Sequence, residues 1–291
     1  MTPASATLIG FGAIVLWSSL GLLTALAGAI PSFQMVALTF SLSGSLSLIG
    51  FSQRSHWRRE LKQTPFKVWL LGVWGLFGYH FCYFLALRHA PAVEANLVNY
   101  LWPLLIVLFS GLLPGQQLRS WHIFGVLLGV AGATLLILAQ GSELKGESLF
   151  GFSMAALAAL AWSSYSVLSR HFAHISTATV GGFCTLTALL AWPAHLILES
   201  WVAPTLPQWF AIIGLGLGPV GAAFFLWDIG MKRGHIQLLG TLSYLTPLFS
   251  TLLLLLAGFG VWHAVLLISG ALIISGALIA SWDVWWPQRS R

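Results

Sequence analysis

Charged side chains are scarce in this sequence. Only 7% of the 291 residues are Asp, Glu, Lys or Arg, whereas 58% are hydrophobic. A soluble domain carries about 25% charged residues, and this chain has too few polar side chains to cover a surface that faces water. The composition therefore excludes an ordinary water-soluble globule and predicts a protein whose surface mostly contacts the lipid bilayer.

Cysteines and catalytic motifs are also scarce. The two cysteines, Cys82 and Cys184, lie in apolar runs, and we interpret them as small packing residues rather than a disulfide. The sequence has no P-loop, no HExxH, GxSxG or CxxC pattern, and no carboxylate pair inside an apolar run. These absences predict a protein that is not an enzyme, with no catalytic residue, metal or cofactor. A membrane-embedded enzyme remains the alternative of another class.

Basic residues are few as well. There are only 13 Lys and Arg, so the positive net charge indicates membrane topology and no nucleic-acid partner. No Asp or Glu falls at the centre of an apolar run, where it would bind Na⁺ or relay protons. This absence fits facilitated export or downhill exchange, and coupling through His80 stays open as an alternative.

Long apolar runs are what the sequence has in place of charge. A membrane-spanning helix needs about 20 mostly apolar residues, and only helices or closed barrels satisfy the backbone in lipid. The runs are long and lack the alternation of barrel strands. The sequence therefore predicts an all-α polytopic membrane protein with ten transmembrane helices. They are expected at 7–29, 34–51, 67–87, 92–113, 121–140, 149–170, 177–198, 208–230, 236–258 and 262–283.

The basic residues fall mostly on one side of this predicted topology. Eleven of the 13 Lys and Arg lie in alternate loops and near the termini, and only Arg88 and Lys145 lie on the other side. Because cytoplasmic loops are enriched in Lys and Arg, we expect both termini to be cytoplasmic.

Three short motifs recur in order along the chain at nearly constant spacing. VNYLWPLL at 98–105 returns as LSYLTPLF at 242–249, 144 residues later. WSS at 17–19 returns at 162–164, and the Trp-His pair at 121–122 returns at 262–263. The motifs predict two domains, 1–145 and 146–291, of five helices each. Because five is odd, the second unit enters the membrane inverted, an architecture that places a substrate site between the halves.

The chain resembles a known family at these motifs. Ten helices in two inverted units, with a proline in the fourth and ninth, resemble the EamA-type exporters of the drug/metabolite transporter superfamily. The segment ANLVNYLWPLLIVLFSGLL at 95–113, with WSSLGLL at 17–23 and WSSYSV at 162–167, is similar to the bacterial aromatic amino acid exporters of that group. The resemblance implies a multi-pass protein of the bacterial inner membrane that exports amino acids, aromatic ones preferred, by alternating access.

Helical spacing groups the polar residues of the apolar runs into shared faces. Such residues tend to face the bundle interior or a water-filled cavity. The faces mix aromatic rings with amide, hydroxyl and imidazole groups. Trp102 is included because of the resemblance, since its helical position also fits a lipid-facing residue. The predicted substrate-binding residues are Trp17, His80, Tyr83, Asn96, Asn99, Tyr100, Trp102, Trp162, Ser163, Ser166, Ser243 and Tyr244.

Each of these candidates also has a purely structural interpretation. His80 could be hydrogen-bonded to a neighbouring helix, and Trp17 and Trp162 could pack helices together. Taken together as a binding site, the predicted residues fit a substrate with an apolar ring and a polar end, such as a small-molecule amino acid. Lipophilic or aromatic cations of the viologen kind would use the same rings by cation–π contact, and they stay open as an alternative with other small metabolites. A monomer would suffice for such a site.

Two further groups are predicted, prolines that kink or gate helices and charged residues that form salt bridges or a gate. Pro103 and Pro247 lie inside apolar runs, where proline removes a hydrogen bond and kinks the helix. Asp228 and Lys232 are spaced for an ion pair on one helix face, and Arg88 is a candidate partner of Glu94. We expect the first, third, fourth, sixth, eighth and ninth predicted helices to line the cavity, with the fifth and tenth peripheral.

Overall fold

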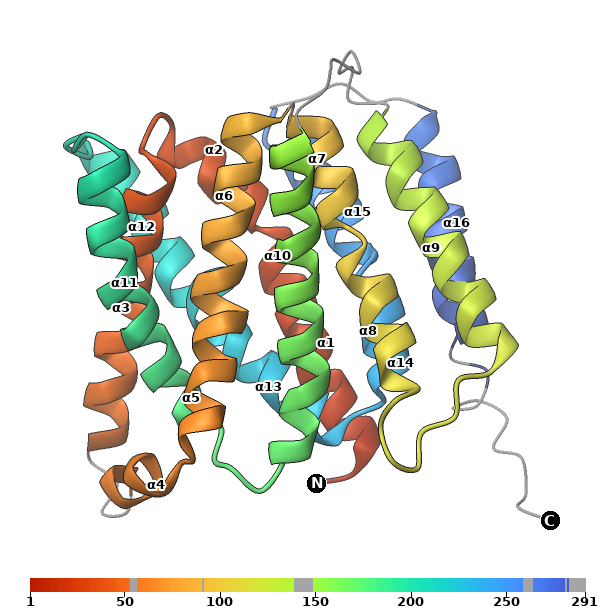
Figure 1. Ribbon diagram of the computed structural model, residues 1–291. Coiled ribbons are helices and arrows are strands. Elements are labelled where there is room, and N and C mark those ends of the chain that lie inside the picture. Colours follow the sequence, from red (N-terminus) through yellow and green to blue (C-terminus); the bar gives the residue numbers. More distant parts are fainter. Residues whose placement is uncertain (53–56, 91, 139–148, 259–263, 281, 283–291) are drawn as a thin grey trace.

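The computed structural model describes residues 1–52, 57–90, 92–138, 149–258, 264–280 and 282, and within these ranges the chain forms helices and no strands (Figure 1). The elements of the first half are α1 (Pro3–Ser18), α2 (Leu20–Ala27), α3 (Ser32–Ser52), α4 (Trp57–Gln63), α5 (Phe66–Val73), η1 (Trp74–Gly78), α6 (Tyr79–His89), α7 (Ala92–Asn99), α8 (Trp102–Ser110) and α9 (Ser120–Leu138). Those of the second half are α10 (Leu149–Leu168), η2 (Ser169–Phe172), α11 (Thr179–Leu198), α12 (Leu206–Leu217), η3 (Gly218–Ala222), α13 (Ala223–Arg233), α14 (Ile236–Leu242), α15 (Leu245–Leu256) and α16 (Val265–Ala280).

Many of these elements join end to end into long apolar rods. Within the described residues, seven rods are long and apolar enough to cross a membrane. Two shorter apolar helices cover Ser120–Leu135 and Val265–Ala280. The seven rods are Pro3–Ala27, Ser32–Gly50, Phe66–His89, Leu149–Phe172, Thr179–Leu198, Leu206–Arg233 and Ile236–Leu256.

Two predicted helices are each broken in two. The range 92–113 holds α7 and α8, separated at Tyr100 and Leu101, and the range 236–258 holds α14 and α15, separated at Ser243 and Tyr244. Proline explains the position of the breaks, because Pro103 and Pro247 fall in the first turn of the second helix of each pair. A proline is tolerated there, since the first N–H groups of a helix have no intrahelical partner.

Two other rods each contain one turn of π-helix. The π-turn η1 joins α5 to α6, and η3 joins α12 to α13. The two turns begin 144 residues apart, the same spacing that separates the two tyrosine–proline motifs. A π-turn inserts one residue into the helix and rotates the side chains that follow, and such turns are frequent at functional sites. No pattern in the sequence predicted either one.

The rods stand side by side with α1 beginning and α16 ending at the same end of the bundle, the lower end in Figure 1. We call this the lower end, and the opposite end, where α6 ends and α7 begins, the upper end. The helices α9 and α16 pack together at one side of the bundle (Figure 1). Their backbones touch at two glycines, because a Cβ on Gly125 would lie 2.5 Å from the carbonyl oxygen of Gly276. Glycine at position 125 therefore allows the two helices to approach closely.

Candidate functional site

A cavity of about 220 Å³ lies between the two halves of the chain. Its walls come from α1, α2, α6, α7, α8, α10, η3, α13 and α15. Neither α9 nor α16 contributes a lining residue. The lining residues are Trp17, Leu20, Gly21, Tyr79, His80, Tyr83, Asn96, Asn99, Tyr100, Trp102, Trp162, Pro219, Val220, Phe224, Thr246 and Ser250.

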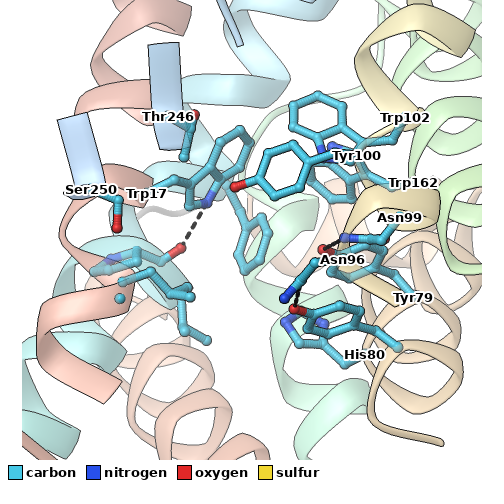
Figure 2. A pocket seen from close by; sticks show the side chains of 16 residues that line it. Trp17, Tyr79, His80, Asn96, Asn99, Tyr100, Trp102, Trp162, Thr246 and Ser250 are labelled. Carbon is cyan, nitrogen blue, oxygen red and sulfur yellow. Dashed lines mark hydrogen bonds between the residues drawn. The ribbon is translucent and has the colours of Figure 1, made fainter. Parts of the chain in front are cut away.

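Eight of the twelve predicted substrate-binding residues line this cavity, and Figure 2 shows most of them facing it. They are Trp17, His80, Tyr83, Asn96, Asn99, Tyr100, Trp102 and Trp162.

The other four predicted residues do not line the cavity, and each has a hydrogen-bond partner elsewhere in the bundle. The hydroxyl of Ser163 donates to the carbonyl of Leu160 at 3.2 Å, and that of Ser243 donates to the carbonyl of Leu239 at 2.8 Å. Ser166 accepts a hydrogen bond from the Trp227 indole at 3.0 Å. Tyr244 is fully buried, and its hydroxyl reaches the break between α7 and α8.

Thr246 and Ser250 line the cavity but were not among the predicted residues. On an unbroken helix they would share a face with Ser243, three and seven residues further on. In the structure they lie four residues apart on α15 and line the cavity, whereas Ser243 and Tyr244, at the break, do not. Helical spacing from Ser243 was therefore the available sequence signal for both residues.

The π-turns explain two further omissions. Tyr79 and His80 are neighbours in sequence, yet both line the cavity directly after η1. On the other side, Pro219 and Val220 belong to η3 itself and line the cavity together with Phe224. A doublet of adjacent aromatic residues in an apolar run was the available sequence signal for Tyr79. Nothing comparable marked Val220.

Aromatic rings form a continuous wall around Trp17. Its ring centroid lies 5.5 Å from that of Trp162, 6.3 Å from that of Trp102 and 5.0 Å from that of Trp227. Most of these pairs meet edge to face or tilted, an arrangement that aromatic quadrupoles favour. The Trp17 indole N–H donates to the carbonyl of Pro219 at 3.0 Å, which fixes the ring (Figure 2). This wall offers flat apolar surface to one small ring-bearing molecule.

Neutral polar groups lie among the aromatic rings of the lining. The amide nitrogen of Asn99 donates to the Tyr79 hydroxyl at 3.3 Å, and the Tyr83 hydroxyl donates to the amide oxygen of Asn96. Two buried oxygens, Oδ1 of Asn99 and Oγ1 of Thr246, have no protein partner. Because buried polar groups are nearly always hydrogen-bonded, these two oxygens are positions for water or for the polar end of a ligand.

His80 is positioned by its own helix. Its Nδ1 lies 2.7 Å from the carbonyl oxygen of Leu76, so Nδ1 carries the proton in the neutral ring, and this tautomer leaves Nε2 as an acceptor. The ring stands edge-on to Phe40 with centroids 5.1 Å apart. The hydrogen bond is thus made within its own rod and not to a neighbouring helix, and the side chain also lines the cavity.

A second, much smaller cavity of about 10 Å³ lies toward the lower end, beside Asp228. The carboxylate of Asp228 pairs with the ammonium of Lys232 at 2.9 Å, as the spacing predicted, and both side chains are buried. Thr177 donates to the same carboxylate at 2.7 Å, and Lys232 also donates to the carbonyl of Ile175 at 3.1 Å. These bonds tie α13 to the segment before α11.

Three buried oxygens around this small cavity lack a protein partner: Oδ1 of Asp228, the Tyr165 hydroxyl and Oγ1 of Thr179. The volume is enough for about one water molecule. Nearby, Arg170 donates to the carbonyls of Met231 at 3.1 Å and Gly234 at 2.8 Å. His235 lies between two spans. Its pKa is lowered mainly by burial and to a smaller extent by the charge of Arg170.

At the upper end a second carboxylate joins three helices. Glu199 pairs with Arg88 at 3.2 Å and with His195 at 3.0 Å. Its two oxygens also accept from the backbone N–H groups of Phe33 and Gln34 at the start of α3, both at 3.0 Å. A carboxylate suits a helix N-terminus. The partner predicted for Arg88 was Glu94, whose side chain lies outside the described part of the structure.

No group of three or more His, Cys, Asp or Glu residues that could hold a metal occurs within the described ranges. The lining of the large cavity contains no charged side chain either. What the site offers is therefore shape, aromatic surface and neutral hydrogen bonding.

An all-helical bundle with an aromatic and polar cavity between two halves is the arrangement of a membrane transporter. The chain belongs to the EamA-like transporter family, whose model matches residues 4–138 and again residues 149–282.

Several curated relatives are similar along nearly the whole chain. The aromatic amino acid exporter YddG of Ancylobacter novellus is 50% identical over 283 residues, which cover 97% of this chain and 98% of that protein. The protein of the same name from Salmonella typhimurium is 30% identical over 94% of this chain and 97% of its own length. A solved crystal structure with 49% identity superposes with a TM-score of 0.90 and covers 95% of this chain and 97% of that one.

Proposed function

We propose that this protein exports amino acids, aromatic ones preferred, across the bacterial inner membrane by alternating access. The observation that carries the proposal is the lining of the 220 Å³ cavity, which combines an aromatic wall with two unpartnered neutral oxygens. A cavity without charged side chains suits a zwitterion, whose own charges cancel, better than a phosphate or a polyamine. The names of the similar exporters support the same substrate class.

The proposed topology has ten spans in two inverted units, 1–145 and 146–291, with both termini cytoplasmic. Three kinds of observation support it: the family model matches twice, the two π-turns are 144 residues apart, and both tyrosine–proline segments are broken helices. The basic residues of the described lower end also support the orientation, since cytoplasmic ends are rich in Lys and Arg. They are Arg59, Lys62, Lys67, Arg119, Arg170, Lys232 and Arg233.

In this scheme the cavity is open to the upper, extracytoplasmic side and closed on the cytoplasmic side. Leu20, Gly21 and Asn96 belong to elements of the upper end, and they line the cavity. Toward the lower end, the aromatic cluster around Trp227 and the ion pair of Asp228 with Lys232 close the path. Arg88 and Glu199 would take the corresponding role at the upper end when the cavity faces the cytoplasm.

Transport in proteoliposomes tests the substrate class. We expect vesicles that contain the purified protein to release labelled phenylalanine and tryptophan down their gradients, with no chemical change in the released molecule. Competitor arms should include a viologen-like dication, a polyamine and a nucleotide sugar. Release of the dication alone would replace amino acid export by cation export through the same aromatic wall. A chemically altered product would indicate an enzyme.

Substrate analogues test how the polar end is bound. Oγ1 of Thr246 can donate a hydrogen bond to a carboxylate, and Oδ1 of Asn99 can accept one from an ammonium group. We expect Thr246→Val to weaken competition by phenylalanine by about tenfold, the order of one hydrogen bond to a charged group. Competition by phenethylamine, which lacks the carboxylate, should change far less.

The matched control for this experiment is Thr241→Val. Thr241 is buried on α14, donates to the carbonyl of Gln237 at 3.0 Å and does not line the cavity. This variant should retain the competition profile of the unmodified protein. An equal loss for phenylalanine and phenethylamine in Thr246→Val would contradict the assigned role of Thr246.

The prolines at the two breaks give a further prediction. Alanine at position 103 or 247 supplies an N–H that can restore the missing helical bond and straighten the segment. We expect Pro103→Ala and Pro247→Ala each to slow transport several-fold while membrane insertion and yield stay unchanged. The matched control is Pro193→Ala, since Pro193 lies inside α11 and does not line the cavity. If the control slows transport as much as the two test variants, the breaks have no special role.

A further inference from the structure

The hydroxyl of Tyr244 occupies the place of a missing helical hydrogen bond in the other half of the protein. It accepts from the backbone N–H of Leu104 at 3.1 Å and donates to the carbonyl of Tyr100 at 3.4 Å. In an unbroken α-helix, the N–H of Leu104 would bond directly to the carbonyl of Tyr100. A side chain inserted into the helical ladder is a recognised cause of a sharp bend. Tyr244 therefore bridges the break between α7 and α8.

A glycine makes room for the Tyr244 ring. A Cβ on Gly129 of α9 would lie 2.5 Å from the ring carbon Cδ2 of Tyr244, so only glycine permits this approach. Tyr244 itself is 0% exposed. The ring and the hydroxyl are thus both locked in the present arrangement.

The equivalent residue of the first half is in a different position. Tyr100 precedes Tyr244 by 144 residues in the matching motif, yet its side chain lines the cavity, with the hydroxyl directed into it (Figure 2). The glycine equivalent to Gly129 is Gly270, 141 residues later, which is the sequence offset between the two Trp-His pairs. A Cβ there would have Leu248 as its nearest neighbour, at 3.6 Å. That position is not filled by a tyrosine ring.

A second pair of residues shows the same asymmetry. The Trp17 indole bonds to the carbonyl of Pro219 inside η3. In the repeat, Trp162 is the equivalent of Trp17. Gly75, which lies inside η1, is the equivalent of Pro219. Gly75 instead lies against the ring of Tyr165, because a Cβ on it would overlap that ring. The side chains of Trp17 and Tyr244 therefore each bond to the backbone of the other half. Their equivalents, Trp162 and Tyr100, do not make the corresponding bonds.

From this asymmetry we propose that Tyr244 and Tyr100 are reciprocal latches that exchange roles between the two access states. In the present state Tyr244 bridges the break in the first half, and the Tyr100 hydroxyl faces the cavity. In the opposite state Tyr100 bridges the break between α14 and α15, at the N–H of Leu248 and the carbonyl of Tyr244, and the Tyr244 hydroxyl faces the cavity. The latch rests on the proposed function, because it requires alternating access between inverted halves.

The latch makes each hydroxyl essential to one state only. Without the Tyr244 hydroxyl, a buried N–H and a buried carbonyl lose their partners in the present state, whereas the opposite state loses only a contact with water or substrate. An unpartnered buried group disfavours a state by roughly tenfold in population. Tyr244→Phe therefore shifts the protein toward the opposite state, and Tyr100→Phe shifts it toward the present one.

Thiol labelling of the full-length protein in membranes measures this shift. The background is Cys82→Ala with Cys184→Ala, since both native cysteines are buried. One reporter is Ser250→Cys, which lines the large cavity, and the other is Ser169→Cys, which is buried at the small cavity of the lower end. We expect Tyr244→Phe to slow labelling at position 250 and speed it at position 169, each about tenfold. Tyr100→Phe should do the reverse, and the double variant should return both rates toward their starting values.

Two glycine variants test the same latch without touching a hydroxyl. Gly129→Ala places a methyl group against the Tyr244 ring and should shift labelling as Tyr244→Phe does. Gly270→Ala meets nothing closer than 3.6 Å in the present state and should shift labelling as Tyr100→Phe does. A structural role alone would make all four variants shift labelling in one direction, and that result would overturn the latch.

The two reporters in the otherwise unmodified protein also separate the two proposals. If substrate changes the ratio of the two labelling rates in the starting protein, but the tyrosine and glycine variants leave it unchanged, the latch is wrong and alternating access stands. If substrate never changes the ratio in the starting protein, alternating access itself fails.

Discussion

Trp162→Ala is expected to reduce transport of aromatic amino acids at least tenfold. The ring of Trp162 joins both sides of the cavity wall, with centroids 5.5 Å from Trp17, 5.8 Å from Tyr79 and 5.7 Å from Phe224. Truncation of a buried tryptophan costs about 3–5 kcal/mol, through lost burial and the void that remains. Part of that free energy is lost from substrate binding, because the substrate ring would stack on the same wall.

The measurement is initial efflux of labelled phenylalanine from proteoliposomes, at matched amounts of reconstituted protein. Trp201→Ala is the matched control, since Trp201 lies near the upper end, is 52% exposed and does not line the cavity. We expect the control to transport at the unmodified rate. Full transport by Trp162→Ala would remove this residue from the substrate site.

Asp228→Asn is expected to destabilise the closed lower end strongly. The substitution leaves the ammonium of Lys232 buried without its counter-charge, because the amide oxygen of asparagine and the Ile175 carbonyl are both neutral acceptors. Breaking a buried ion pair by removing one partner costs about 3–5 kcal/mol. We expect a Tm lower by several degrees in detergent and a protein that labels more readily from the cytoplasmic side.

The double variant Asp228→Asn with Lys232→Met separates the charge effect from the loss of packing. Removing both charges eliminates the unpaired ammonium, and replacing a buried ion pair by apolar groups is often neutral for stability. We expect the double variant to recover most of the lost Tm. If it remains as unstable as Asp228→Asn, the buried charge is not the cause, and the bond from Thr177 to the carboxylate becomes the better explanation.

The fold class was predictable because lipid imposes a simple rule on sequence. A backbone in hydrocarbon must satisfy its own hydrogen bonds, so long apolar runs predict helices at nearly the positions where the structure has them. The interruptions were less predictable. Pro103 and Pro247 indicated two bends, but the π-turns η1 and η3 carry no comparable mark.

The site was predictable where helices are regular. Asn96, Asn99 and Tyr100 share a face up to the break, and all three line the cavity. At the second break Ser243 and Tyr244 were predicted to line the cavity, but the residues of this segment that line it are Thr246 and Ser250, three and seven residues after Ser243. A period of 3.6 residues holds only while the backbone repeats the same dihedral angles.

The scarcity of charge and the length of the apolar runs, both properties of the sequence itself, determined that this protein lies in a membrane as a helical bundle with an aromatic and polar interior. The repeated tyrosine and proline also belong to the sequence, but their roles do not. Tertiary structure alone decided that the Tyr244 hydroxyl enters the ladder of the other half while Tyr100 faces the cavity. The reason is physical: two segments of similar sequence can be packed differently, and only the contacts of the whole bundle decide which packing each of them has.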